Sequence, residues 1–395
     1  MKGFLCALLQ DALITIFLRP LDPLLSRLFP TYQSKHNDMI EREREREIKK
    51  KKILYYSDKT TDHMRDFYGD TLYTCKIGNT SKKISHVVRP EWATLNIDAY
   101  SNKNIVQYVR TTECDYPVRQ AMIEKRKRWG QRLFDGPTHF LHQIVFNQGN
   151  IHFEIGTYSY FQRISFVDDF EQEGFAWIYR GKQTRTKLRK KHLPVPTSAS
   201  LTTYNTLPIG CDTVVALVLG GKYHICVHKR EFTTVNYPDA TMVTPTFGLE
   251  RLEHPGIENQ LLHAALQEYA EELFNRKEVE NKVNRRPCPT YFYSDYQEVA
   301  DMLQLLEQGK AEFILNGCGF DAIGGFLNLS TLLIVHDEDS SQKIYRTAKG
   351  NWEAQDGTCE FIPIDDRRLE ELLQTNMLSP ASAFAISRAI SILNP

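Results

Sequence analysis

The chain has 395 residues, and 49 lysines and arginines balance 49 aspartates and glutamates, so its formal net charge at pH 7 is zero. This length allows two or three domains, and the balanced charge gives no global preference for nucleic acid, so no specific nucleic-acid binding is predicted. The eight cysteines include no Cys-x-x-Cys pair, which argues against a zinc ribbon or a compact disulfide framework and favours a reducing, cytoplasmic setting.

Residues 1–30 are apolar but are interrupted by Gln10 and Asp11 and closed by Arg19 and Pro20. A membrane-spanning helix needs about 20 predominantly apolar residues, so this segment is not predicted to cross a bilayer. We interpret it as an amphipathic segment that packs on this protein or docks on a partner protein. The alternative is peripheral contact with a membrane surface.

Residues 31–52 are dominated by charge, because glutamate and arginine alternate from Glu41 to Glu47 and lysines occupy 49–52. Such a run is typical of a solvated linker or of an exposed charged helix, and we interpret it as a linker. The lysines would also suit anionic lipid if residues 1–30 lay on a membrane.

Residues 53–200 are predicted to form a smaller α+β unit of unassigned role. Residues 151–155 alternate as a strand does, and the aromatic run 157–161 continues it. A core strand is the preferred interpretation of this run, and stacking on a nucleotide base is the alternative. The basic stretch 180–192 precedes a proline-containing boundary and is interpreted as a solvated linker, with contact to a polyanion as the alternative.

Residues 201–395 are predicted to form the second, larger unit. The β-rich runs 213–219 and 223–227 flank a Gly-Gly turn, which predicts a hairpin, and 326–335 predicts a later, buried strand. Two closing helices are expected at 368–373 and 379–393. This succession of elements indicates a mixed α/β unit.

The helix expected around residues 262–273 carries the clearest chemical signal. At about 100° per residue, Glu268, Glu271 and Glu272 fall on one side of it. The other side is apolar and is formed by Leu262, Leu266, Tyr269 and Leu273. Carboxylates at this spacing repel one another by a few tenths of a kcal/mol per exposed pair. A divalent cation with oxygen ligands would offset that repulsion, and a solvated acidic face is the alternative.

This region resembles the signature of the Nudix hydrolase superfamily, which is a loop glycine, a glutamate, and then Arg-Glu-apolar-x-Glu-Glu on a helix. Residues 267–272 are Gln-Glu-Tyr-Ala-Glu-Glu and match the helical part, except that glutamine replaces arginine. The glycine-bearing loop is 245–250, after a strand expected at 240–243. The resemblance extends over residues 201–395.

The resemblance implies that residues 201–395 adopt a Nudix-like α/β/α sandwich with a mixed sheet. It implies a Mg²⁺ or Mn²⁺ site, with Glu268 also serving as the base for the attacking water. The implied metal ligands are Glu268, Glu271 and Glu272. The substrate-binding residues expected from the same resemblance are Gly248, Glu250 and Arg230. Further candidate carboxylates are Glu258, Asp337 and Glu338.

The leading functional hypothesis is a pyrophosphatase: metal-dependent hydrolysis of a nucleoside diphosphate linked to another moiety, by attack of water on the pyrophosphate. Its ligand would be a nucleotide-type small molecule. A second hypothesis is a catalytically weak or inactive Nudix-like module that binds a nucleotide and has a regulatory output. A third is a purely structural interaction protein that uses residues 1–30.

Three departures from the signature motivate the second hypothesis. Gln267 offers only neutral hydrogen bonds where an arginine would form a salt bridge. The loop between Gly248 and the helix is longer than the pattern, and the intermediate glutamate falls on Asn259. The glycine usual after the last glutamate pair is also missing, because Leu273, Phe274 and Asn275 follow instead.

Overall fold

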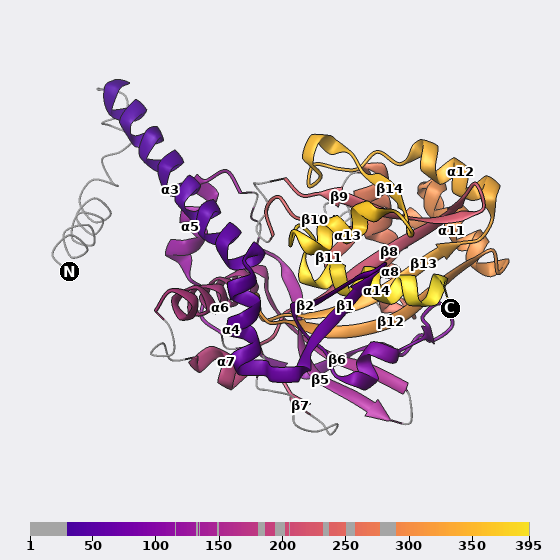
Figure 1. Cartoon of the computed structure of the whole chain (residues 1–395), viewed down its shortest axis with the longest axis horizontal. Coiled ribbons are helices and arrows are strands. Elements are labelled where there is room, and N and C mark those ends of the chain that lie inside the picture. The colour runs from indigo at the N-terminus through magenta and orange to yellow at the C-terminus, as the bar shows by residue number, and fades with distance from the viewer. Residues whose placement is uncertain are drawn as a thin grey trace.

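The computed structural model describes residues 30–394 except 115, 132, 134, 148–149, 181–185, 194–201, 205, 232–236, 250–256 and 277–289. These residues form a mixed α+β fold with a large sheet, a smaller sheet and helices packed around both (Figure 1). The amphipathic segment predicted at 1–30 lies outside the described residues except for its last residue, and so does Glu250. Within the described part of the chain, no helix has both the length and the apolar character needed to span a membrane.

The larger sheet is mixed and carries most of the core. Its main path is β1 (Leu72–Ile77), β2 (Thr80–Val87), β12 (Ala311–Asp321), β13 (Leu327–Val335), β8 (Ile209–Leu219), β9 (Lys222–Lys229) and β10 (Thr241–Val243). The short strands attached to it are β3 (Ile97–Asp98) on β12, β11 (Thr246–Gly248) on β8 and β14 (Glu360–Pro363) on β9. β8 and β13 run parallel at the centre, where both are almost completely buried.

The predicted hairpin is confirmed, because β8 and β9 are antiparallel and meet at Gly220 and Gly221. These residues have φ of 60° and 73°, a conformation that glycine adopts without steric cost. The buried strand predicted at 326–335 is β13. Its pairing with β8 starts at Ile209 and Leu327, so the beginnings of the two central strands lie together.

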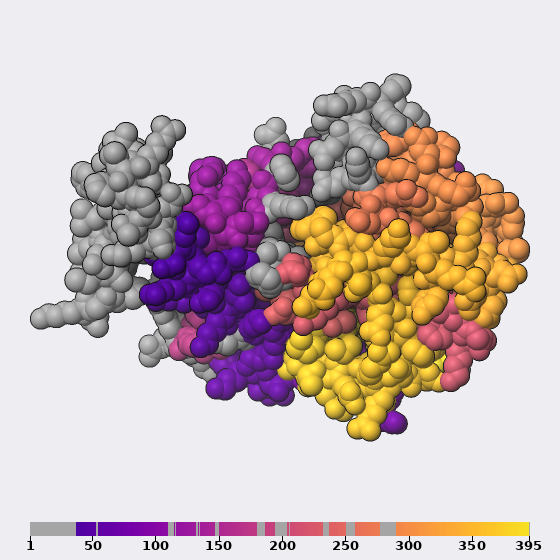
Figure 2. Space-filling model, turned by 90° about the horizontal axis from the view of Figure 1, so that it is seen from above, coloured from indigo at the N-terminus to yellow at the C-terminus, as the bar shows by residue number. Residues whose placement is uncertain are grey.

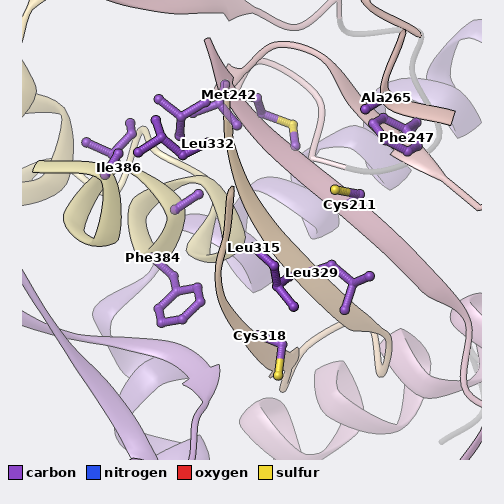
Figure 3. Packing of buried hydrophobic residues seen from close by; sticks show 14 of the residues in the cluster. Cys211, Met242, Phe247, Ala265, Leu315, Cys318, Leu329, Leu332, Phe384 and Ile386 are labelled. Atoms are coloured by element: carbon purple, nitrogen blue, oxygen red, sulfur yellow. The ribbon is translucent and has the colours of Figure 1, made fainter. Parts of the chain in front are cut away.

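Helices of the C-terminal half pack against this sheet. They are α8 (Gln260–Glu268), η6 (Tyr269–Leu273), α10 (Phe292–Asp295), α11 (Gln297–Glu307), α12 (Glu338–Thr347), η7 (Gln355–Gly357), α13 (Arg367–Gln374) and α14 (Pro380–Leu393). The two predicted closing helices are confirmed as α13 and α14. Figure 3 shows Phe384 and Ile386 of α14 on one side of the central strands, and Ala265 of α8 beside Phe247 on the other. The sheet is therefore covered on both faces.

The smaller sheet has the order β4 (Val106–Glu113), β6 (Asn150–Ser159), β5 (Pro137–Asn147) and β7 (Thr202–Thr203). The strand predicted at 151–155 is confirmed within β6. The first three residues of the aromatic run 157–161 continue it as far as Ser159, and the chain then turns into a helix at Tyr160. The helices of this half are α3 (Pro30–Tyr56), α4 (Asp58–Tyr68), η3 (Gly69–Thr71), η4 (Pro90–Thr94), α5 (Gln120–Arg128), α6 (Tyr160–Arg180) and α7 (Lys187–His192).

Two basic segments interpreted as solvated linkers are instead helical and partly buried. The first lies in α3, where Lys51 is 7% exposed and its Nζ is 3.3 Å from Glu171 of α6. The second includes α7, where Arg189 is fully buried and donates to Glu173 of α6 and to the carbonyl oxygen of Ala322. A buried cation needs such partners. Helix α6 supplies the acids that both segments pair with.

The two sheets do not divide at the boundary predicted near residue 200. Strands β1, β2 and β3 precede it yet belong to the larger sheet, whereas β7 follows it and belongs to the smaller sheet. One continuous apolar core contains both Phe153 of β6 and Leu329 of β13. Figure 2 shows the N-terminal helices, in indigo, bordering the C-terminal residues, in yellow, and the amide of Asn376 donates to the carbonyl oxygen of Tyr56 over 3.1 Å.

Candidate functional site

The glutamate helix begins with a side-chain cap. Asn259, which takes the place of the intermediate glutamate of the Nudix signature, accepts a hydrogen bond from the backbone N–H of Leu262 over 3.0 Å. Its amide also donates to the carbonyl oxygens of Ala99 and Tyr100 over 2.7 and 3.1 Å. Asn259 therefore fixes the start of α8 against the first half of the chain.

The predicted apolar face of this helix is confirmed. Its four members are buried: Leu262, Leu266, Tyr269 and Leu273. Ala265 lies beside Phe247 of β11 (Figure 3), so the helix packs on the short strand that carries Gly248. This packing sets the distance between the helix and the loop glycine.

The three glutamates do not share one exposed face. Glu268 is partly exposed at the end of α8, whereas Glu271 and Glu272 are 9% and 5% exposed in η6. The prediction assumed α-helical spacing, but η6 is a π-helical turn, in which hydrogen bonds run from i to i+5 and each residue turns less. Two of the three carboxyl groups are therefore buried rather than presented to solvent.

Glu272 is the most buried of the three. Its Oε2 accepts hydrogen bonds from the hydroxyl of Thr244 over 2.8 Å and from the backbone N–H of Thr246 over 3.0 Å. Burial raises the pKa of Glu272 to about 8, and the charge of Glu353 adds to the rise, while both threonine bonds and Arg230 act in the opposite direction. The carboxyl group is therefore mostly protonated at pH 7.

Arg230, the predicted substrate-binding cation, belongs to the same cluster. Its Nη2 lies 2.8 Å from Oε2 of Glu353, and both side chains are largely buried. Glu353 follows α12 in the chain and was not predicted, because no periodic pattern around it connects it with the glutamate helix. The arginine is thus already paired with a carboxylate of this chain.

Asp212 of β8 is a second buried carboxyl group that was not predicted. It accepts hydrogen bonds from the amide of Asn328 over 2.6 Å and from the hydroxyls of Ser382 and Thr246 over 3.3 and 3.4 Å. Burial raises its pKa to about 6. Thr246 links the two acids, because its backbone binds Glu272 and its side chain binds Asp212. The feature of the sequence that could have indicated Asp212 is a single acidic residue at the start of an apolar strand.

Gln267 stands where the signature has arginine. Its Nε2 is 3.4 Å from Oε1 of Glu271, at the long end of hydrogen-bond distances. An arginine there would hold a carboxylate with a charge-assisted, bidentate contact. The orientation of Glu271 by Gln267 is weaker than the family pattern implies.

The further candidate carboxylates lie elsewhere. Glu338 accepts hydrogen bonds from the backbone of the β8–β9 turn, at the opposite end of β8 from Asp212, and Asp337 caps the start of α12. Glu258 is on the surface and pairs with Lys103. These three acids therefore have local structural contacts and do not join the glutamate helix.

The Mg²⁺ site that the resemblance implies needs several carboxylates around one position. In the described ranges, no group of three or more histidine, cysteine, aspartate or glutamate side chains is placed to hold a metal ion. One oxygen of Glu272 is already occupied by two donors. As arranged here, these side chains do not fit a three-carboxylate metal site.

No protein-family model matches the chain, and no curated protein matches it. The resemblance to Nudix proteins therefore rests on the motif itself and on the order of the elements around it.

Proposed function

We propose that the larger sheet and the helices of residues 201–395 form a Nudix-like α/β/α sandwich, in which β1, β2 and β3 complete the sheet. We propose that this unit binds a nucleotide-type small molecule and has little or no metal-dependent hydrolase activity at neutral pH. The order of elements supports this fold: a hairpin, a loop after Arg230, a short strand ending at Gly248 and a helix with three glutamates. The helix packs on that strand, as a ligand site between loop and helix requires (Figure 3).

The observation that carries the proposal is the environment of Glu272. A carboxyl group must be ionised to bind a metal ion. With a pKa of about 8, Glu272 loses its proton at pH 7 only at a cost of about 1.4 kcal/mol. Oε2 of Glu272 also accepts hydrogen bonds from Thr244 and Thr246, which a metal ion bound to that oxygen would have to share. Burial favours the neutral acid at pH 7, which supports binding without efficient turnover.

Contacts between segment 237–239 and helix α3 could transmit the effect of ligand binding to the first half of the chain. Segment 237–239 shortly precedes β10, and the ring of Tyr237 packs on that of Tyr55 with centroids 4.1 Å apart. The hydroxyl of Tyr56 donates to the carbonyl oxygen of Pro238 over 2.5 Å. A ligand that moves segment 237–239 would therefore act directly on α3.

The test is calorimetric titration of the full chain with ADP-ribose and a panel of nucleoside diphosphate compounds, followed by product analysis with Mg²⁺ or Mn²⁺. We expect saturable binding and no metal-dependent product at pH 7, in the wild type and in the control variant Glu258→Gln. Absence of binding to every compound contradicts the proposal.

The hydrolase remains the second candidate, because Glu268 keeps partial exposure next to Glu271. If the chain is a hydrolase, turnover depends on metal, is abolished by Glu271→Gln, and rises between pH 7 and pH 9 as Glu272 ionises. Metal-dependent turnover with this pH profile would contradict the binding proposal and support the hydrolase.

A further inference from the structure

Arg163 of α6 lies at the junction of the two halves of the fold. Its guanidinium packs against Gly248 at the end of β11, so closely that a Cβ at residue 248 would overlap it. The guanidinium also lies 5.9 Å from the centre of the Tyr160 ring. Among the described residues, no hydrogen bond or ion pair engages it. The acids of α6 pair instead with other neighbouring cations, which are Lys51, Arg126 and Arg189.

A second polar group near Arg163 also has no partner. Tyr158 of β6 is 4% exposed, and its hydroxyl is buried without a hydrogen bond in the described structure. Tyr158 pairs with Thr138 of β5, and the hydroxyl of Thr138 donates to the carbonyl oxygen of Leu249 over 3.2 Å, so this end of β6 lies beside the residue that follows Gly248. Burial raises the pKa of Tyr158 well above its usual range. Buried tyrosine hydroxyls normally have a hydrogen-bond partner.

The chain between these residues is held rigidly. Ser159 accepts from the backbone N–H of Gln162 over 3.1 Å, and Gln162 accepts from the backbone N–H of Ser159 over 2.8 Å, which is a capping box at the start of α6. The amide of Gln162 also donates to the carbonyl oxygens of Cys114 and Tyr116. The backbone between Tyr158 and Arg163 is therefore fixed by this cap.

We propose that Arg163 and the hydroxyl of Tyr158 bind a phosphate group beside Gly248. The planar guanidinium offers paired N–H donors that match phosphate oxygens, and a phenol hydroxyl donates one more hydrogen bond. Gly248 leaves the space that the guanidinium occupies. Both donors lie outside the part of the chain that resembles Nudix proteins, since β6 and α6 belong to the first half, whereas Gly248 lies within it.

This inference rests on the proposed nucleotide binding and specifies it. Thr246, which binds Glu272, and Gly248, which packs on Arg163, are two residues apart on β11. With a rise of about 3.3 Å per residue, they are separated by about 7 Å. A diphosphate can reach that far, so one phosphate bound at Arg163 would place the rest of the ligand near the glutamate helix.

Calorimetric titration of the full chain with inorganic phosphate and with ADP-ribose tests the inference. We expect saturable phosphate binding that is weakened about tenfold by Arg163→Gln and several-fold by Tyr158→Phe, because each loses donors to a charged group. Arg163→Lys keeps the positive charge but lacks the paired N–H donors of the guanidinium, so it should retain part of the phosphate affinity. Arg65→Gln removes an equal charge on the surface and should change nothing.

The outcomes separate this inference from the proposed function. Absence of saturable phosphate binding, or equal phosphate affinity in Arg163→Gln and Arg65→Gln, overturns it. Phosphate binding that depends on Arg163 while ADP-ribose does not bind supports the anion site and contradicts the nucleotide proposal. If thermal melting shows that Arg163→Gln does not fold, the comparison of Tyr158→Phe with the wild type decides.

Discussion

Thr244 donates its hydroxyl proton to Oε2 of Glu272 over 2.8 Å. This bond connects the segment between β10 and β11 to the glutamate helix. It acts on the most buried carboxyl group of that helix and stabilises its ionised form against the effect of burial. The balance between these two influences determines whether Glu272 carries a charge.

Replacing Thr244 by valine should lower the free energy of unfolding by about 1–3 kcal/mol, because Glu272 keeps only the backbone donor of Thr246. The loss should be larger at pH 9 than at pH 6, since an ionised carboxylate depends more on a donor than a neutral acid does. Urea unfolding at both pH values measures it. Thr358→Val, on the surface, is the matched control, and an equal loss in the two variants contradicts the prediction.

Glu272→Gln should remove a pH dependence of stability. The folded-state pKa of about 8 exceeds the ordinary value of 4.5, so the stability linked to this group is fully present below 4.5 and is lost as pH rises to 8. Relative to the wild type, the variant should therefore gain on the order of 2–4 kcal/mol between pH 5 and pH 9. Denaturant unfolding at pH 5, 7 and 9 measures the difference. Asp212 contributes equally to the pH dependence of the wild type and of the variant, so its contribution cancels in the difference.

Glu258→Gln is the control for this experiment, because Glu258 is exposed and hydrogen bonding to Lys103 lowers its pKa. The free energy of unfolding of Glu258→Gln, relative to that of the wild type, should not increase as the pH rises. A pH-independent difference for Glu272→Gln would mean that the group is ionised throughout.

Gln267→Arg restores the residue expected from the Nudix signature. The arginine should form a charge-assisted contact with Glu271 and favour its ionised form. We expect no metal-dependent turnover at pH 7, because Glu272 remains protonated. Product analysis with Mg²⁺ over a nucleotide panel checks this. Turnover in the variant but not in the wild type would instead assign the loss of activity to the glutamine.

Arg189→Met should destabilise the protein by about 3 kcal/mol, because Arg189 is fully buried and pairs with Glu173. Its loss leaves Glu173 with only backbone donors and the carbonyl oxygens of Phe170 and Ala322 without the guanidinium. Thermal and urea unfolding measure the effect. Arg368→Met removes an exposed arginine that pairs with Glu360 and should cost less than about 1 kcal/mol. Similar losses in both variants would argue against a structural role for the buried cation.

Elements with strong local patterns could be predicted from the sequence. The hairpin β8–β9 follows from β-rich runs around Gly220 and Gly221, and β13 follows from an apolar run of strand length. The buried face of the glutamate helix follows from its helical period. The charged segment in α3 was misjudged, because its composition does not reveal that Glu171 lies opposite Lys51. That contact joins residues far apart in the chain.

The sequence by itself determined where strands and helices form around the three glutamates, because backbone preferences and hydrophobic periodicity act over a few residues. Only the tertiary structure decided what those glutamates can do. The π turn η6 buries Glu271 and Glu272, and Thr244, Thr246 and Glu353 reach Glu272 from other parts of the chain. The charge of a carboxyl group depends on its burial and on every neighbouring dipole and charge, and these are assembled only by folding.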